Sequence, residues 1–295
     1  MAHFYLPQTQ QKTDFFNLKA CTTMKAGLWN VGGPPLFISS DDPGIATVST
    51  AAQYGGTLAS GSGMFEFFIT GARAGSILLR AKTDTGDQWA FTQAVVSGGD
   101  LCINATGSDV QQLQERLNSL DPTRLPRLNP TGRFDVPTKA RAMEYQFHQG
   151  LVVDGVVGPK TWARLAKAAA AHRIGGAPRG KCVLVDLIHT TLTAYSSGVP
   201  VMTVSPVHGG SPDHPSHAGV FPISPTRRLR DHTSSSYPYP AGNMNFSLFY
   251  NGPEALHQGP GSLPSKGCIH VSAPYAEQLF NWAGNDDVIV IVVKP

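Results

Sequence analysis

The hydrophobic pattern of this 295-residue chain changes its period twice, and these changes divide the chain into three segments. Residues 13–99 hold short, β-prone apolar runs such as Ser76–Ala81, which are separated by Gly and Pro. Residues 105–170 instead place apolar side chains three or four positions apart, as on one face of a helix. Beyond residue 181 the short β-prone runs return, with one helix expected at Ala273–Ala283. We therefore predict a multidomain α+β chain.

Charge and apolar content argue against a nucleic-acid-binding protein and against a membrane-spanning protein. The chain has 23 Lys and Arg against 20 Asp and Glu and no Lys/Arg-rich run, which gives nucleic-acid binding little support. No stretch approaches the ~20 apolar residues of a membrane span. The N-terminal residues 1–11 lack both the basic and the apolar region of a signal peptide. We expect delivery outside the general secretory route, or a chain whose leader has been removed.

The four cysteines, Cys21, Cys102, Cys182 and Cys268, stand far apart, without a C-x-x-C pair or zinc-type spacing. Cys21 and Cys102 bracket the first segment and could form a disulfide in an oxidising compartment. The sequence leaves this pairing open, because a disulfide depends on the distance between the two Cα atoms.

The first segment carries the signs of a small β-sandwich. Short strands are expected at Ile45–Val48, Phe65–Ile69 and Ser76–Ala81, and residues 83–87 (TDTGD) form an expected hairpin turn. The pattern IATVS, FFITGARAGSILLRAKTDTG and WAFTQAVV resembles bacterial immunoglobulin-like domains. The resemblance implies no chemistry, and we expect a spacer or docking module.

The second segment predicts three helices. Ser108 or Asp109 can cap the first, Thr138–Phe147 forms the second, and Pro159 stands near the start of the third. The sequence TGRFDVPTKARAMEYQFHQGLVVDGVVGPKTWARL strongly resembles the peptidoglycan-binding type 1 family. This resemblance implies a three-helix module that holds an enzyme on the cell wall. We expect the small core of the module to be formed by Leu113, Phe147 and Trp162.

The stretch Ser265–Val271 (SKGCIHV), with His257 eleven positions before its cysteine, has the residues that thiol acyl transfer requires. A thiolate is the nucleophile in such reactions, and a nearby imidazole can act as its base. The small Gly267 before Cys268 lets a carbonyl carbon approach. The alternative is an inert core thiol, since free cysteine is among the most buried residue types.

From about Lys181 to Val293 the chain resembles the L,D-transpeptidase catalytic domain, also called YkuD. The segments that carry the resemblance are SHAGVFPI, NFSLFY and LHQGPGSLPSKGCIHV, although the usual proline of the T-P-x-G-x-F segment is replaced. The resemblance implies that Cys268 is the nucleophile and His257 its base, while Ser265 and Gly267 shape the turn and the oxyanion site. It also implies cleavage of the bond between meso-diaminopimelate and D-Ala in a stem tetrapeptide, through a thioester, with an amine or water as acceptor.

This motif departs from the family pattern at Lys266, at His270, at Gln258, where glycine is usual, and in its short loop from His257 to Ser265. Lys266 stands where a second histidine is usual, and His270 replaces the usual arginine. Both are expected to bind substrate: Lys266 would lower the thiol pKa or bind a substrate carboxylate, and His270 would donate to substrate or take over a structural polar role. The short loop from His257 to Ser265 and the variable residue before Gly-Cys resemble a branch of the superfamily used as wall-targeting toxins between bacteria. A catalytically silent wall-binding module is a further alternative.

Histidines also gather at His208, His214 and His217, with His232 further along. Their spacing would suit a zinc peptidase, because histidine is a common zinc ligand. No H-E-x-x-H motif or similar carboxylate partner accompanies them. We favour a mobile lid or a wall of the substrate site.

We expect the protein to use no cofactor and no metal. The expected partners are the glycan and stem peptides of peptidoglycan, and a secretion machine or an immunity protein is an alternative further partner. The expected location is the cell envelope, the periplasm or the periplasm of a target cell. The predicted domains are residues 1–12 as a tail, 13–100 as an immunoglobulin-like sandwich, 101–172 as the peptidoglycan-binding domain, 173–180 as a linker and 181–295 as the catalytic domain.

Overall fold

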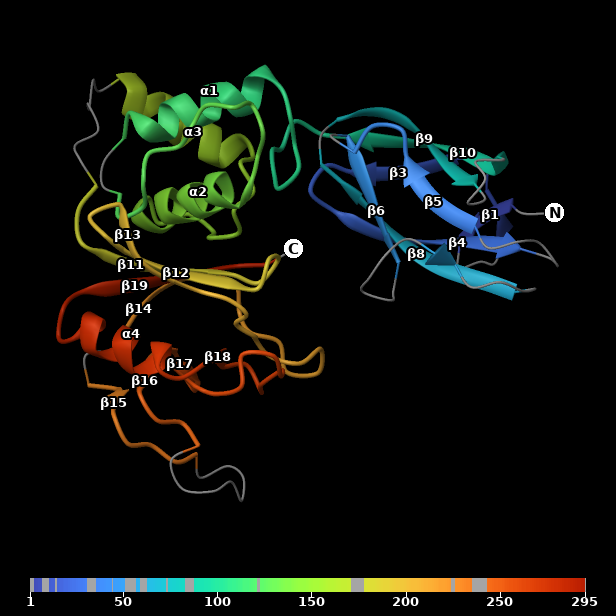
Figure 1. Cartoon of the computed structure of the whole chain (residues 1–295). Coiled ribbons are helices and arrows are strands. Elements are labelled where there is room, and N and C mark those ends of the chain that lie inside the picture. Colours follow the sequence, from blue (N-terminus) through green and yellow to red (C-terminus); the bar gives the residue numbers. More distant parts are fainter. Residues whose placement is uncertain are drawn as a thin grey trace. The chain divides into compact units, whose positions relative to one another are not determined.

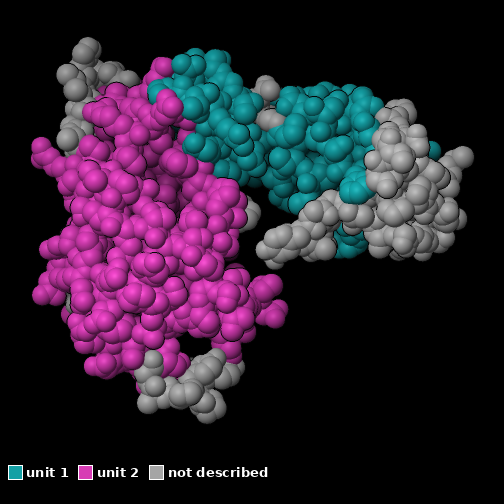
Figure 2. Space-filling model, in the orientation of Figure 1, with its two compact units in different colours: residues 1–113, 130–135, 156–162 teal, residues 114–129, 136–155, 163–295 magenta. Residues whose placement is uncertain are grey.

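The computed structural model divides the chain into two compact units, which Figure 2 shows in different colours. The first unit comprises residues 1–113, 130–135 and 156–162, and the second comprises residues 114–129, 136–155 and 163–295. The structure describes residues 3–6, 11–13, 15–30, 36–43, 45–50, 57–58, 63–72, 74–82, 88–120, 123–170, 178–223, 226–234 and 243–294. The expected hairpin turn at 83–87 and most of the expected linker at 173–180 lie outside these residues.

Two five-stranded sheets form the β-sandwich of the first unit (Figure 1). One has the order β2-β1-β4-β8-β6, and the other has the order β3-β10-β9-β5-β7. Their bounds are β1 His3–Leu6, β2 Gln11–Lys12, β3 Phe15–Lys19, β4 Thr23–Asn30, β5 Leu36–Ser40, β6 Ala46–Thr50, β7 Thr57–Leu58, β8 Gly63–Gly71, β9 Gly75–Lys82 and β10 Gln88–Ser97. Alternate side chains of both sheets, among them Phe4, Phe16 and Phe67, fill one shared core. The predicted sandwich is therefore present.

The strand order supports the immunoglobulin-like prediction. Strands β1-β4-β8-β6 follow the A-B-E-D order of an immunoglobulin sandwich, and β10-β9-β5 follow the order G-F-C. The sandwich also begins earlier than the sequence indicated. Residues 1–12 were expected to be a tail, but β1 pairs with both β2 and β4.

A disulfide joins Cys21 to Cys102 across 81 residues, with the two Cα atoms 5.6 Å apart. Cys21 follows β3, and Cys102 follows β10, the last strand of the sandwich. The bond links the segment after β3 to the segment after β10, the last strand of the sandwich. Cys21 and Cys102 therefore form the pair that the sequence left open.

The three predicted helices are present as α1 (Ser108–Asn118), α2 (Val136–His148) and α3 (Pro159–Ala170). Leu113 is fully buried as expected, but the prediction for Phe147 was wrong, because its side chain is 37% exposed. Helical spacing puts Phe147 on the same face as Met143, yet it lies in the last turn, where that face reaches solvent. Among the helices that the structure describes, none combines the length and apolar character needed to cross a membrane.

The second unit contains a five-stranded sheet that is covered on both faces. Its order is β13-β12-β11-β19-β14, with β11 and β19 parallel at the centre. The bounds are β11 Lys181–Asp186, β12 Thr191–Ser196, β13 Val199–Val204, β14 Gly219–Pro222 and β19 Val288–Val293. All six residues of β19 (VIVIVV) are buried, as expected for a parallel strand covered on both sides. Helix α2 contacts β19 and β14 on one face.

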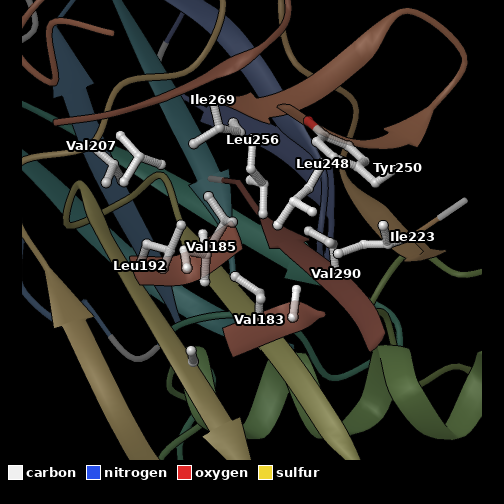
Figure 3. Packing of buried hydrophobic residues seen from close by; sticks show 14 of the residues in the cluster. Val183, Val185, Leu192, Val207, Ile223, Leu248, Tyr250, Leu256, Ile269 and Val290 are labelled. Carbon is white, nitrogen blue, oxygen red and sulfur yellow. The ribbon is translucent and has the colours of Figure 1, made fainter. Parts of the chain in front are cut away.

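A four-stranded sheet, β15-β16-β17-β18, faces the first sheet across the main core of the unit. Its bounds are β15 Arg228–Leu229, β16 Ser247–Asn251, β17 Glu254–Gln258 and β18 Ile269–Val271. Figure 3 shows Val183, Val185 and Val290 of one sheet opposite Leu256 and Ile269 of the other. Helix α4 (Tyr275–Ala283) adds its buried residues to the same core.

We predict that the Cys21–Cys102 disulfide contributes strongly to the stability of the sandwich. The Cys21→Ser/Cys102→Ser double variant should lose about 4 kcal/mol of unfolding free energy, because closing a long loop removes chain entropy from the unfolded state. Chemical denaturation with and without a reductant measures this. Reductant should destabilise the wild type and leave the double variant unchanged. Equal stability of both proteins would contradict the prediction.

Candidate active site

The parallel pairing of β17 and β18 brings the predicted nucleophile and base to one face of a sheet. The register joins Leu256 to Ile269 and His257 to His270. Leu256 and Ile269 point into the core, so the neighbouring side chains of each strand point to the opposite face. Cys268 and His270, two residues apart, therefore share this face with His257. The His257 and His270 rings lie edge to face, with centroids 5.0 Å apart.

A short turn holds Cys268 immediately before β18. The Ser265 hydroxyl accepts a hydrogen bond from the Gly267 N–H at 3.0 Å and donates to the Cys268 carbonyl. Gly267 has a φ of +106°, which favours glycine, and a Cβ at this position would lie 3.1 Å from Oε1 of Glu254. Ser265 and Gly267 therefore shape the turn that carries the thiol.

A second segment pairs with the other side of this turn. The Ser265 N–H donates to the Gly209 carbonyl and the Ser211 N–H donates to the Ser265 carbonyl, both at 2.9 Å. The His270 N–H donates to the His208 carbonyl, also at 2.9 Å. The turn is thus held between β17 on one side and residues 208–211 on the other.

Ser216 links this second segment to the nucleophile turn through its side chain. Its hydroxyl is buried, accepts from the Gly210 N–H at 2.9 Å and donates to the Gly267 carbonyl at 2.7 Å. Gly210 permits the close approach, because a Cβ there would lie 2.8 Å from the Gly267 nitrogen. One hydroxyl therefore satisfies two backbone groups next to Cys268.

The thiol of Cys268 lies in an apolar environment. It packs against Met244, Phe249 and Ala255, and Sγ contacts the Pro253 carbonyl at 3.7 Å. Burial raises the pKa of the thiol, the Ala255 N–H opposes this, and the charge of Glu254 raises it further. The thiol of Cys268 is therefore protonated at rest.

His257 is a buried imidazole whose tautomer is set by a backbone carbonyl. Its Nδ1 lies 2.8 Å from the Gln258 carbonyl, so Nδ1 carries the proton and Nε2 holds a free lone pair. Burial lowers the pKa of His257 to about 4. Among the described residues no hydrogen bond joins Cys268 to His257, so the site holds a neutral thiol and a neutral imidazole rather than an ion pair.

The two remaining predicted site residues lie beside the thiol. Lys266 is exposed on the turn that precedes Cys268. His270 shares the face of Cys268, and its Nδ1 lies 3.0 Å from the Leu263 carbonyl. Burial lowers the pKa of His270, so its imidazole is neutral at neutral pH.

The histidines considered as zinc ligands do not converge. Nδ1 of His217 lies 2.8 Å from Oε1 of Glu254, His208 pairs through its backbone with His270, and the ring of His232 meets Phe249 edge to face. In the described part of the chain, no group of three or more His, Cys, Asp or Glu side chains is arranged to hold a metal ion. His208 and His217 instead lie beside the nucleophile turn.

Sequence reasoning missed two residues of this site, Ser216 and Glu254. The only available signal for Glu254 was a lone carboxylate in the apolar run that follows the turn at Asn251–Pro253. Ser216 was seen only as part of the SHAGVFPI segment.

A cavity of about 600 Å³ lies elsewhere in the second unit. Its lining includes Arg124, Arg179, Lys181, Asp286 and Asp287, and it contains neither Cys268 nor His257. Two ion pairs, Arg124–Asp287 and Lys181–Asp286, occupy four of these side chains. The cavity is therefore separate from the thiol site.

A thiol on a tight turn beside a carbonyl-anchored imidazole belongs to the class of cysteine acyl-transfer enzymes. Comparison with known families identifies the type. Residues 106–165 match the peptidoglycan-binding domain family PG_binding_1, and residues 180–291 match the L,D-transpeptidase catalytic domain, YkuD. The chain is an L,D-transpeptidase-type enzyme with a peptidoglycan-binding domain before its catalytic domain.

Several solved structures are similar to this chain, with low TM-scores. An L,D-transpeptidase from Stackebrandtia nassauensis is 20% identical, with a TM-score of 0.36, over 67% of this chain and 94% of that chain. One from Xylanimonas cellulosilytica is 26% identical, with a TM-score of 0.32, over 64% and 94%. One from Mycobacterium smegmatis is 12% identical, with a TM-score of 0.32, over 95% and 94%. No curated protein matches the chain, so the assignment rests on the two family matches.

We predict that Ser216→Ala weakens the support of the nucleophile turn. The change leaves the Gly267 carbonyl and the Gly210 N–H without their buried partner, which should lower the unfolding free energy by about 2 kcal/mol. Urea denaturation measures this loss. Ser262→Ala, at an exposed position near the same turn, is the matched control and should leave stability unchanged. A wild-type unfolding midpoint for Ser216→Ala would contradict the prediction.

Proposed function

We propose that the protein cleaves the bond between meso-diaminopimelate and D-Ala in stem tetrapeptides through a thioester on Cys268. The acyl group then passes to an amine, giving a crosslink or an exchanged stem, or to water. The observation that carries the proposal is the shared face of Cys268 and His257, where Nδ1 of the imidazole is fixed and Nε2 is free to accept a proton. The matches to a peptidoglycan-binding and an L,D-transpeptidase domain support peptidoglycan as the substrate.

In the first step Nε2 of His257 takes the thiol proton as Sγ attacks the carbonyl carbon. A neutral imidazole suits this role, because a protonated one has no lone pair to offer. The backbone N–H of Cys268 is the proposed oxyanion donor. It makes no intramolecular hydrogen bond within the described residues, whereas the Gly267 N–H is held by Ser265. Such a donor is worth on the order of 3 kcal/mol in the transition state.

In the second step the imidazolium gives its proton to the nitrogen of D-Ala as the C–N bond breaks. This leaves a thioester on Cys268 and a neutral His257. An incoming amine or water then loses its proton to His257 while its nitrogen or oxygen attacks the thioester carbon. Collapse of this intermediate expels the thiolate, which recovers the proton from His257.

Lys266 and His270 are the proposed substrate-binding residues. The exposed ammonium of Lys266 can attract a stem carboxylate, and it lies two residues from the nucleophile. His270 lies against His257 on the face that carries the thiol. Its neutral imidazole can share a hydrogen bond with the stem peptide.

The proposed site of action is the cell envelope, because both matched domains belong to proteins of peptidoglycan. The helical module would hold the enzyme on the wall while the catalytic domain acts on stem peptides. The N-terminal sandwich is the proposed spacer or docking module.

The proposal is tested by incubating the purified protein with sacculi and analysing the muropeptides by mass spectrometry. The wild type should convert tetrapeptides to tripeptides, to stems with an exchanged D-amino acid, or to new dimers. Cys268→Ala should abolish every product while binding to sacculi is retained, and His257→Ala should lower the rate about 100-fold or more. Unchanged release of D-Ala by Cys268→Ala would overturn the assignment.

The pH dependence provides a separate prediction. Because the pKa of His257 is about 4, the base stays neutral at neutral pH and gains a proton only as the pH falls through about 4. kcat/KM should therefore stay constant from near neutrality down to about pH 5 and then decline, whereas an ordinary imidazole would give a decline near ~6.5. A rate profile with its acidic limb near neutrality would contradict the role assigned to His257.

A further inference from the structure

A buried carboxylate lies directly behind the nucleophile turn. The side chain of Glu254 is 6% exposed, yet it is held entirely by hydrogen bonds from the chain. Oε1 accepts from the His217 N–H at 3.2 Å and lies 2.8 Å from His217 Nδ1, while Oε2 accepts from Nδ2 of Asn251 at 2.9 Å. Both oxygens have partners, so Glu254 is not an open site for a ligand.

The position of Glu254 couples it to the thiol. Its Oε1 fills the space that a Cβ on Gly267 would need, one residue before Cys268. Its negative charge raises the pKa of the Cys268 thiol, and it also raises the pKa of Tyr250, whose main cause of shift is burial. The groups that face this carboxylate are therefore His217, Asn251, Tyr250 and Cys268.

His217 is the solvent-facing partner in this arrangement. Its side chain is 72% exposed, so its ring faces solvent while Nδ1 stays against Glu254. It directly follows Ser216, whose hydroxyl holds the Gly267 carbonyl. The same two residues thus attach their segment to both the backbone and the carboxylate behind Cys268.

We propose that Glu254 and His217 form a hydrogen-bonded pair that positions the Gly267–Cys268 turn and sets the reactivity of the Cys268 thiol. Glu254 disfavours the thiolate in the resting enzyme, and His217 moderates that effect by donating to the carboxylate. The thiol then stays protonated until His257 takes its proton during attack. Both are positioning residues, and their effect on turnover, though not on the thiol itself, rests on the proposed function.

The pair is tested through the reactivity of Cys268 toward iodoacetamide, measured against pH. All four cysteines lie in the described residues: Cys21 and Cys102 are joined and Cys182 is buried, which leaves Cys268 as the accessible thiol. Glu254→Gln should speed alkylation at neutral pH roughly threefold, since the gain in thiolate exceeds the loss in nucleophilicity. His217→Ala should slow it by a similar factor.

If the two residues only supported the turn structurally, both substitutions would change the alkylation rate in the same direction. Opposite changes in the rate therefore indicate control by the charge of Glu254. In the Glu254→Gln background, His217→Ala should have no further effect on the alkylation rate. His214→Ala, an exposed histidine of the same segment, is the control and should match the wild type. Thermal unfolding verifies that each variant is folded.

Alkylation needs no substrate, so its outcome is independent of whether peptidoglycan is processed. If both folded variants are alkylated at the wild-type rate across the pH range, the proposed role of the pair is overturned, even if muropeptides are converted. The predicted opposite shifts with no muropeptide conversion would support the pair and reject the proposed reaction. If Glu254→Gln does not fold, unchanged alkylation in His217→Ala alone overturns the proposal, because the exposed imidazole can be removed without opening the core.

Discussion

The register of β17 against β18 is the constraint on which the site depends. Side chains alternate between the two faces of a strand, so a slip of one residue would send Cys268 into the core and Ile269 to the surface. β18 has only three residues, which is too short to fix its own position. Backbone hydrogen bonds from residues 208–211 and the buried side chains Leu256 and Ile269 supply the missing restraint.

Burial favours the neutral form of both the Cys268 thiol and the His257 imidazole. Desolvation raises the pKa of the Cys268 thiol and lowers the pKa of His257. A preformed thiolate–imidazolium pair would require two charges in an apolar environment, with Phe249 and Met244 against the sulfur. In the proposed reaction, proton transfer is therefore coupled to attack on the substrate. The protonated thiol is also less open to oxidation, because oxidation follows thiolate character.

The sequence predicts the periodic elements well and the local chemistry in part. α1, α2 and α3 appear where apolar spacing indicates them. Cys268 and His257 can be proposed from the sequence because they stand in one local motif. Ser216 and Glu254 escape prediction because their interactions arise only on folding: Ser216 bonds to Gly267 across 51 residues, and Glu254 bonds to His217 across 37 residues. β1 escapes for a related reason: four residues before a proline carry too little periodicity to indicate a strand.

The pairing of His217 with Glu254 also explains a departure from the family pattern. The T-P-x-G-x-F segment usually has a proline where this chain has His217. A proline has no N–H and no polar side chain, so it could supply neither of the two contacts that His217 makes to Oε1. Glu254 would then be a buried carboxylate with one oxygen unsatisfied, which costs several kcal/mol. The histidine and the carboxylate are thus physically interdependent. His217 satisfies Oε1 of Glu254, and Glu254 anchors the segment that holds His217. A change at one of the two positions, taken alone, would place either an unsatisfied charge or an unanchored segment beside the nucleophile.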